Sequence, residues 1–417
     1  MKVSSHDIDI LRQLGATQAR IAALPIQKEK ADLWRKLNDL GPVRPLVWIN
    51  EVPWHEMDVN NELVLQTMNP DAQSIELELR RLLYQWYHFP GDMVVSPFIS
   101  CPLKIHSSGI GISENVDVKM TDPANDIISR HYYPQIVDPE DIEKILMPTV
   151  TCDWEATEEK YNWMTNIFGN IIPVQKVGNR GTWFAPWDEL VSWWGVEALM
   201  VDLIQRPEMV NAAITRLMDA RLFELDQWES LNLLSSNANN TRIGSGGYGY
   251  SSTLPMADKV EINLKVRDLW GSATAQIFGS VSPKMHWEFA LRHELRWLER
   301  WGLTYYGCCE PLDRKVDILR RIPNLRKVSL SPWVDIDRAV KLMGSDYVLS
   351  RKPSPAIFAE DNWHPQQARW DLDDFLTKAN GLAIEIIMKD ISTVRYQPER
   401  LWEWEKLAME AVLSKQS

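Results

Sequence analysis

The sequence contains little cysteine, little histidine and no long apolar run. Its four cysteines are too few and too scattered for a disulfide framework, which favours a reducing compartment, and we expect a cytoplasmic protein. Fewer than 18 consecutive apolar residues occur anywhere, and the opening stretch MKVSSHDIDI has no apolar signal core. We therefore expect neither a membrane span nor secretion.

Basic residues are also in deficit. The 417 residues include 45 Lys plus Arg against 57 Asp plus Glu, which gives a formal net charge of -12. Nucleic-acid-binding proteins usually carry a basic patch, so this balance argues against one. A hydrophobic content of 45% with 24% charged residues is ordinary for a globular domain. Tryptophan is the exception, because its 20 residues suit a protein that binds flat apolar or cationic groups.

The alternation of short apolar runs and helical segments predicts an α/β protein, a (β/α)8 TIM barrel. Residues 1–41 show helical spacing that stops at Gly41-Pro42, and we expect an N-terminal helical extension. Residues 42–417 would form the barrel, because runs such as RPLVWIN, LTYYG and LAIEIIM alternate with helices. No glycine-rich phosphate fingerprint follows the first run, which disfavours a nucleotide-binding doubly wound sheet. Within the barrel, residues 60–154 are predicted as an irregular insertion with antiparallel strands near the mouth.

Chemistry in such a barrel lies where the strands end, which selects the candidate residues. The first strand is followed by Asn50, Glu51 and His55, which we take as catalytic candidates, although His55 is equally compatible with a hydrogen bond inside its loop. Later strand ends carry Cys308, Cys309, Glu310, Ser331, Trp333, Asp335, Arg351, Lys352, Lys389 and Asp390.

The segment Tyr306-Gly307-Cys308-Cys309-Glu310 gives a candidate metal site. Adjacent strand residues face opposite ways, so only one of the two cysteines is expected to point into the barrel. Cys308 and Glu310 would then share a face and, with Asp390, hold zinc with one open position. The alternative is that both cysteines are small buried hydrophobes. No CxxC or HxxxH motif decides between them.

Aromatic residues concentrate in three segments that are expected to form loops at the barrel mouth. These supply the substrate-binding candidates Trp183, Phe184, Trp187, Tyr248, Asp268, Trp270 and Gln276. The segment SGGYGYSS, which contains Tyr248, is glycine-rich and expected to be mobile. An aromatic pocket with few polar groups suits a flat apolar substrate or a methylated cation, although most of the tryptophans must fill the core.

The chain also resembles the uroporphyrinogen decarboxylase superfamily, and within it the corrinoid-dependent methyltransferases. The likeness runs from about Pro42 to Ala411. It lies in GTWFAPWDELVSWWGVEALMVDLIQRPEMVNAAITRLMD, in QIFGSVSPKMHWEFALRHELRWLERWG, in YGCCEPL and in IIMKDISTVRYQPERLWEWEKL. Where relatives that activate a thiol carry a zinc motif, this chain has Tyr306 for the histidine, Cys308 for the first cysteine and Asp390 for the last.

The resemblance implies a barrel enzyme that moves a methyl group from a substrate to the cobalt of a separate corrinoid protein. The methyl donor would be a methoxylated aromatic, with its ring held among tryptophans. A metal at Cys308, or a proton from Glu51 or His55, would assist the leaving oxygen. The alternatives are a methylated amine or quaternary ammonium as methyl donor, a decarboxylase or lyase, and a non-catalytic barrel that binds a corrinoid or tetrapyrrole. A homo-oligomer is possible under each alternative.

Overall fold

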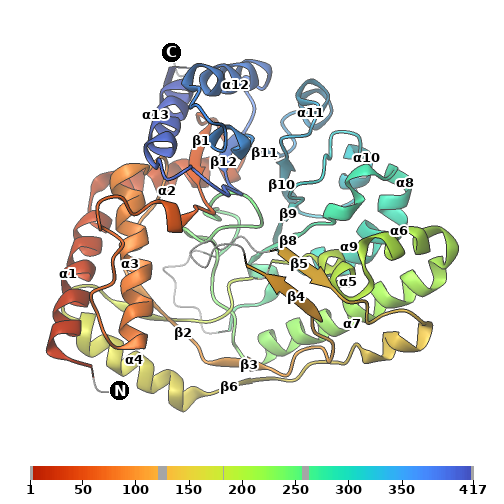
Figure 1. The fold of residues 1–417 in the computed structure, drawn as a ribbon, viewed down its shortest axis with the longest axis horizontal. Coiled ribbons are helices and arrows are strands. Elements are labelled where there is room, and N and C mark those ends of the chain that lie inside the picture. The colour runs from red at the N-terminus through yellow and green to blue at the C-terminus, as the bar shows by residue number, and fades with distance from the viewer. Residues whose placement is uncertain (1–2, 121–128, 182, 256–262, 415–417) are drawn as a thin grey trace.

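A six-stranded parallel sheet forms the centre of the molecule (Figure 1). The computed structural model describes residues 3–120, 129–181, 183–255 and 263–414. In spatial order the strands are β1 (Leu46–Ile49), β12 (Ile384–Met388), β11 (Val348–Arg351), β10 (Leu325–Leu330), β9 (Leu303–Tyr306) and β8 (Trp270–Ala273). Every neighbouring pair is parallel. Strands β8 to β12 lie side by side in chain order, and β12, the last strand, lies beside β1, the first. This winding is typical of a barrel, and the predicted α/β class is confirmed.

A shorter parallel pair continues the same winding. It consists of β2 (Ile99–Pro102) and β7 (Val174–Val177). An isolated parallel bridge joins Asn179 to Leu234. Among the described residues these pairings do not complete a hydrogen-bonded ring with the six-stranded sheet. The fold is therefore TIM-barrel-like, and full closure stays a prediction.

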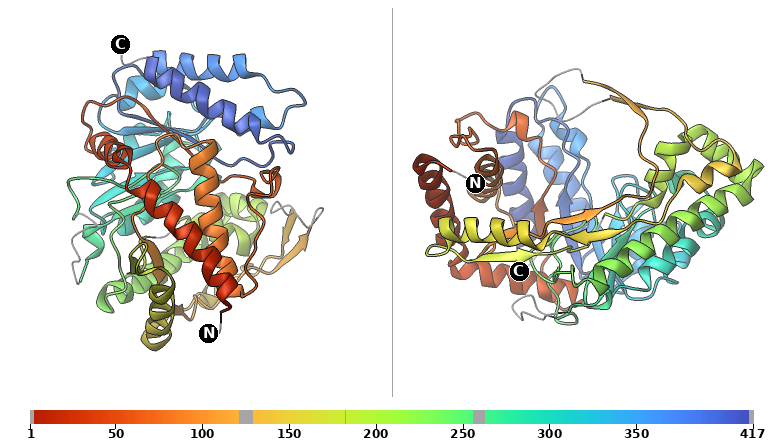
Figure 2. Two further views of the ribbon diagram at one scale, coloured as in Figure 1. Left: turned by 90° about the vertical axis from the view of Figure 1, so that its left-hand side faces the viewer. Right: turned by 90° about the horizontal axis from the view of Figure 1, so that it is seen from below.

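Helices surround the sheet on both flanks (Figures 1 and 2). They are α1 (Ser5–Ala22), α2 (Pro25–Asn38), α3 (Pro70–His88), α4 (Trp154–Phe168), α5 (Pro186–Trp194), α6 (Val196–Gln205), α7 (Pro207–Ser230), α8 (Pro283–His286), α9 (Arg292–Leu298), α10 (Val316–Leu319), α11 (Ile336–Met343), α12 (Pro365–Lys378) and α13 (Glu399–Ser414). Helix α1 packs on α3 and α4. In the described ranges no helix is both long and apolar enough to cross a membrane.

The predicted insertion is more regular than its sequence indicates. It holds the antiparallel pairs β3 (Ile105–Ser107) with β6 (Val150–Cys152) and β4 (Val116–Lys119) with β5 (Ser129–Tyr132), as expected. It also holds α3, where the Asn69 side chain accepts hydrogen bonds from two backbone amides and Pro70 takes the first helical position. The segment therefore contributes to the main fold through α3 and β2, and the domain division stays a prediction.

The helical segment that begins after Ser282 is interrupted. Ser282 caps α8 by accepting a hydrogen bond from the backbone amide of Met285. A π-helical turn, Trp287–Leu291, then separates α8 from α9. Such a turn takes up an extra residue, and here it allows both His286 and Glu294 to contact the Tyr306 hydroxyl, each at 2.8 Å. The three side chains form a fully buried polar chain behind β9.

Beneath the carboxyl ends of the strands, the interior is filled by a buried ion pair and a loop. Lys327 on β10 lies 2.8 Å from Glu385 on β12, and both side chains are fully buried. Glu385 also accepts a hydrogen bond from the backbone amide of Gly247 at 3.0 Å. A Cβ atom on Gly246 would lie 2.4 Å from Glu385 Oε1 and 2.6 Å from the Tyr305 ring. The loop expected to be mobile is therefore packed in the interior, because its backbone supplies the polar partner that a buried carboxylate requires.

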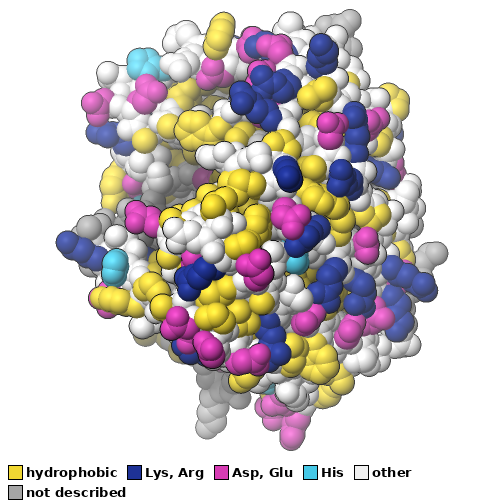
Figure 3. Space-filling view, turned by 90° about the vertical axis from the view of Figure 1, so that its right-hand side faces the viewer, with side chains coloured by type: hydrophobic (Ala, Val, Ile, Leu, Met, Phe, Trp, Pro, Cys, Tyr) yellow, Lys and Arg dark blue, Asp and Glu magenta, His cyan; other side chains and the backbone are white. Residues whose placement is uncertain are grey.

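The surface does not show charge of a single sign on the face drawn in Figure 3, where acidic and basic side chains are intermixed. Ion pairs account for part of this pattern. Arg296 of α9 lies 2.6 Å from Asp219 of α7, and Arg300, which follows α9, lies 2.7 Å from Asp226 of α7. Surface pairs of this kind contribute at most about 1 kcal/mol each.

Candidate functional site

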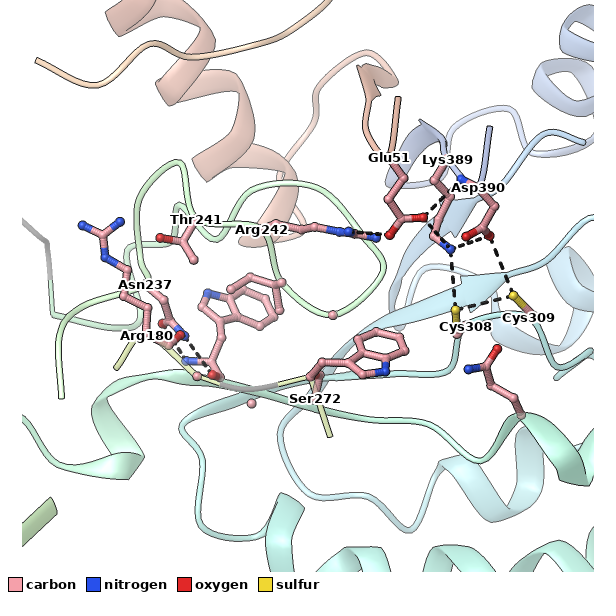
Figure 4. Close-up of a pocket in the computed structure, with 17 residues that line it drawn as sticks. Glu51, Arg180, Asn237, Thr241, Arg242, Ser272, Cys308, Cys309, Lys389 and Asp390 are labelled. Carbon is pink, nitrogen blue, oxygen red and sulfur yellow. Dashed lines mark hydrogen bonds and ion pairs between the residues drawn. The ribbon is translucent and has the colours of Figure 1, made fainter. Parts of the chain in front are cut away.

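A cavity of about 500 Å³ lies where β1, β8, β9 and β12 end (Figure 4). Its walls come from strand ends and from two loops, around Arg180 and around Arg242. Figure 4 shows two groups of side chains. Arg180, Asn237 and Thr241 lie at one end, and Glu51, Lys389, Asp390, Cys308 and Cys309 lie at the other. The cavity therefore occupies the edge of the sheet where a barrel holds its ligand.

Lys389 is the centre of the second group. Its ammonium nitrogen lies 2.5 Å from an Asp390 carboxylate oxygen, 3.3 Å from Glu51 Oε2 and 3.7 Å from the Cys308 sulfur. Only 4% of the Lys389 side chain is exposed. Arg242 holds the other Glu51 oxygen at 2.6 Å. Two cations thus face two carboxylates and a thiol in a confined space, where charges interact strongly because water is largely excluded.

The backbone is strained where this group is built. Glu51 follows β1 with φ of +53°, and Asp390 follows β12 with φ of +56°. Such conformations are uncommon for residues other than glycine and cluster at functional sites. The two turns are joined, because the Asp390 amide donates to Glu51 Oε2 at 3.1 Å. Asn50 supports the first turn, since its side-chain oxygen accepts a hydrogen bond from the Glu51 amide at 2.7 Å.

The protonation states follow from these contacts. Burial raises the pKa of Glu51, but the hydrogen bond with Asp390 and the charges of Arg242 and Lys389 outweigh it and lower that pKa to about 2. Burial and the neighbouring Glu51 raise the pKa of Asp390. Burial lowers the pKa of Lys389, but Cys308 and the two carboxylates overcome this and raise it above its ordinary value. At neutral pH Lys389 is therefore an ammonium and Glu51 a carboxylate.

Both cysteines line the cavity, which corrects the expectation that only one would. Strand β9 stops at Tyr306, and Gly307 turns the chain with φ of +95°, so side-chain alternation ends there. The two sulfurs lie 3.6 Å apart. The contact with Cys309 lowers the pKa of Cys308, and Lys389 adds to this effect against the opposing effect of burial.

Glu310 does not join its predicted metal partners. Its carboxylate accepts hydrogen bonds from the Cys308 amide at 2.9 Å and from Thr274 Oγ1 at 2.9 Å, so it stabilises the turn after β9. Cys308 and Asp390 face the Lys389 ammonium, which is itself a cation. In the described ranges no group of three or more His, Cys, Asp and Glu side chains is arranged to hold a metal ion. As they are arranged here, Cys308, Glu310 and Asp390 do not fit the predicted zinc ion.

The opposite end of the cavity has an unpaired cation. Burial lowers the pKa of Arg180, and no carboxylate in the described part of the chain pairs with its guanidinium. Its guanidinium carbon lies 5.8 Å from the centroid of the Phe98 ring. Asn237 fixes this region, because its amide donates to the carbonyl oxygens of Arg180 and Trp270, at 2.8 and 2.9 Å, and accepts from the Trp270 amide.

Eight of the candidate residues selected from the sequence line this cavity, and the others lie elsewhere. The eight are Glu51, Trp183, Trp270, Gln276, Cys308, Cys309, Lys389 and Asp390. Trp183 is 49% exposed at the mouth. His55 lies in an adjoining cavity of about 330 Å³ that Glu51 and Asp390 also line. Neither of its ring nitrogens has a hydrogen-bond partner among the residues described.

Four predicted substrate-binding residues have structural roles. Phe184 stacks on Trp297 with ring centroids 4.1 Å apart, and Trp187 lies edge-on to Phe278, so both belong to the core around α5. Tyr248 packs between Trp34 and Trp48. Asp268 accepts a hydrogen bond from the Lys265 amide and closes a 3₁₀ turn. Phe184 and Trp187, next to the start of α5, are therefore core residues, in agreement with the alternative that most of the large aromatic side chains fill the core.

Arg180, Arg242, Asn237 and Thr241 carry no predicted role, although they line the cavity. Arg180 comes three residues after β7, so the strand-end rule applied to that strand would have selected it. Arg242 and its neighbours lie in a loop without a preceding named strand, and no sequence signal marks them.

The parallel sheet, its surrounding helices and the cavity at the strand ends define a TIM-barrel-like α/β protein. Among solved structures the chain is similar to a methyltransferase from Methanosarcina mazei, with a TM-score of 0.53 and 11% identity over 93% of this chain and 99% of that chain. At this identity the likeness concerns the fold. No protein-family model and no curated protein matches the sequence.

Proposed function

We propose that the protein is a methyltransferase that moves a methyl group from a methoxylated aromatic to the corrinoid of a separate protein. The observation that carries the proposal is the division of the cavity. An unpaired arginine lies at one end, a lysine-centred polar group lies at the other, and Trp183 lines the wall. The fold shared with a methyltransferase supports the reaction class.

Charge favours an ether over a methylated amine or quaternary ammonium. Three cations, Arg180, Arg242 and Lys389, line the cavity. The carboxylates of Glu51 and Asp390 are already within ion-pair distance of Arg242 and Lys389, so neither is free to attract a further cation. An aromatic cage for ammonium needs the opposite balance. A substrate that becomes negative as it reacts is stabilised by these cations.

Cleavage of the ether leaves both electrons of the methyl–oxygen bond on the aryl oxygen. The corrinoid of the partner protein would supply the nucleophile that takes the methyl group. Lys389 is positioned to donate a hydrogen bond, and then a proton, to the oxygen that leaves. The ordinary pKa values of a phenol and a lysine ammonium are about 10 and about 10.4. Because the pKa of Lys389 is raised further, the proton transfer is uphill in free energy, and the hydrogen bond to the leaving oxygen carries most of the stabilisation.

Glu51 does not serve as the proton donor in this scheme. Its pKa of about 2 leaves it ionised at neutral pH. It instead holds Arg242 and Lys389 in place through its two oxygens, 2.6 and 3.3 Å from their nitrogens. Trp183, about half exposed at the cavity, offers apolar surface for the ring, while Arg180 would receive an electron-rich substituent at the far end. No step is assigned to a metal.

The test is methyl transfer with purified protein and a chemically reduced free corrinoid as acceptor. Methoxybenzoates, neutral methoxybenzenes and methylated amines are offered separately. We expect a phenol product, together with loss of the reduced corrinoid absorbance, from the methoxylated aromatics. Transfer from methylated amines alone would replace the proposed substrate class, and carbon dioxide release without transfer would indicate a decarboxylase.

A further inference from the structure

The second feature of the cavity is a pair of adjacent thiols presented on a fixed turn. Gly307, with φ of +95°, brings Cys308 and Cys309 to the same cavity, with their sulfurs 3.6 Å apart. The backbone of Cys308 is held on both sides. Its amide donates to Glu310 at 2.9 Å, and its carbonyl oxygen accepts from Ser329 Oγ at 2.7 Å. The contact between the thiols is therefore a property of the turn.

The surroundings favour reaction at this pair over the other two cysteines. The Lys389 ammonium lies 3.7 Å from the Cys308 sulfur and stabilises a thiolate. Cys309 is partly exposed at the cavity surface, whereas Cys101 is fully buried in an apolar cluster. Cys152 is part of a short strand, and its thiol has no basic neighbour within hydrogen-bond distance among the described side chains. Thiolate character and access are the two conditions for cysteine oxidation.

We propose that Cys308 and Cys309 are a reversible oxidation site that closes to a disulfide between adjacent residues. With a peroxide as oxidant, the Cys308 sulfur takes one oxygen as the peroxide O–O bond breaks, giving a sulfenic acid and water. The Cys309 sulfur then attacks the Cys308 sulfur, the S–S bond forms, and the second oxygen leaves as water. Two thiol hydrogens and one peroxide thus become two waters.

Such a bond is labile by its geometry. Adjacent Cα atoms across a trans peptide are about 3.8 Å apart, below the roughly 4.4–6.8 Å found for most disulfides. Strained disulfides are readily reduced, so a small dithiol is expected to reopen the ring. Closure converts the Cys308 thiol, which lies 3.7 Å from Lys389, into an uncharged disulfide sulfur, and the ammonium then faces only the two carboxylates. This inference does not depend on the methyl-transfer proposal.

Peptide mapping tests the site on the unmodified protein. Cleavage after Arg300 and Arg314 yields one peptide, residues 301–314, that contains both cysteines and no other. Cys101 and Cys152 fall in separate tryptic peptides, 82–104 and 145–160, which serve as internal controls. The reduced protein is treated with equimolar hydrogen peroxide, alkylated and digested, with and without later reduction by dithiothreitol.

After peroxide we expect peptide 301–314 to carry no alkyl group and to weigh two hydrogen atoms less than its reduced form. After dithiothreitol it should again be alkylated at both cysteines. The control peptides should stay alkylated throughout. The variant Cys309→Ser should instead keep a sulfenic acid on Cys308 that a dimedone probe labels. Two alkylated thiols in peptide 301–314 after peroxide, or oxidation of the control peptides at the same rate, would overturn the proposal. Neither result depends on methyl transfer, so failure here is distinct from failure of the proposed function.

Discussion

The Lys389 ammonium nitrogen lies 3.7 Å from the sulfur of Cys308 and so joins the end of β12 to the end of β9. The two residues are 81 positions apart in the chain. The contact places a proton donor and a thiol at the same end of one cavity. It is the relationship from which both proposals start, and each can be tested without the other.

Lys389→Met should lower kcat/KM for ether cleavage by about 10²- to 10⁴-fold, the range expected for loss of a positioned proton donor. The loss should be smaller for aryl ethers whose phenols are more acidic, because their oxygens leave without help. Initial rates across a series of ring substituents measure this dependence. Lys378→Met, at a surface ion pair with Asp374, is the control and should act like the unmodified protein. An equal loss for every leaving group would remove Lys389 from the proton-transfer role.

Arg180→Met should weaken binding of substrates that carry an anionic ring substituent by about 10- to 100-fold, because a charge-assisted hydrogen bond contributes about 1.5–3 kcal/mol. Neutral methoxybenzenes should lose far less. KM values for a matched pair, a methoxybenzoate and the corresponding methoxybenzene, separate the two cases. If both substrates lose affinity equally, Arg180 shapes the cavity rather than pairing with the substrate.

Glu294 should make the protein less stable as pH rises. Burial raises its pKa to about 8, and the hydrogen bond from Tyr306 only partly opposes this. Its folded-state pKa is above the ordinary 4.5, so its contribution to stability is complete below about pH 4.5 and is lost as pH rises towards 8. Glu294→Gln should flatten this loss, by on the order of a few kcal/mol between pH 5 and 9.

Urea unfolding at several pH values measures that difference. The control is Glu288→Gln, which lies at the π-helical turn just before α9 and is partly exposed beside Arg292. It should leave the pH dependence unchanged. A Glu294→Gln protein that loses stability with pH as steeply as the unmodified chain would show that Glu294 is ionised in the folded state.

Gly246→Ala should destabilise the fold by about 1–3 kcal/mol, the usual cost of overpacking a rigid interior. The added Cβ would meet the Glu385 carboxylate and the Tyr305 ring. Gly109→Ala is the comparison, because no atom lies within 4 Å of its Cβ position and only the cost of its φ of +70° applies. Thermal or denaturant unfolding of both variants distinguishes interior contact from backbone conformation alone.

Strand ends were the part of the site that the sequence predicted best. Glu51, Cys308 and Asp390 line one cavity because the carboxyl ends of parallel strands meet at one edge. The pairing among them was not predictable, since it depends on left-handed turns at Glu51 and Asp390 and on Gly307, whose conformations no local pattern specifies. The roles of Phe184 and Trp187 were misjudged for a related reason. A tryptophan-rich helix start is equally suited to a pocket and to a core, and tertiary packing decides.

The barrel fold was likewise predictable in part. The six-stranded sheet followed from the alternation of apolar runs and helices, whereas β2 and β7 form a separate two-stranded sheet in the described part of the chain. Helix α3 lies within residues 60–154, which the sequence predicts to be irregular, although Asn69 and Pro70 form an ordinary helix start. The π-helical turn after His286 was not predictable, because it serves contacts to Tyr306 from a different strand.

The glycine-rich loop has a consequence for how substrate choice can change. Main chain from Ile243 and Gly244 forms part of the cavity wall, and the neighbouring glycines are wedged against Tyr305, Trp34 and Glu385. Substitution of side chains does not change the shape of a cavity wall that consists of tightly packed backbone. This part of the wall can therefore change only if the backbone moves, whereas substitution of lining side chains such as Trp183 and Arg180 can change which substrates the cavity accepts.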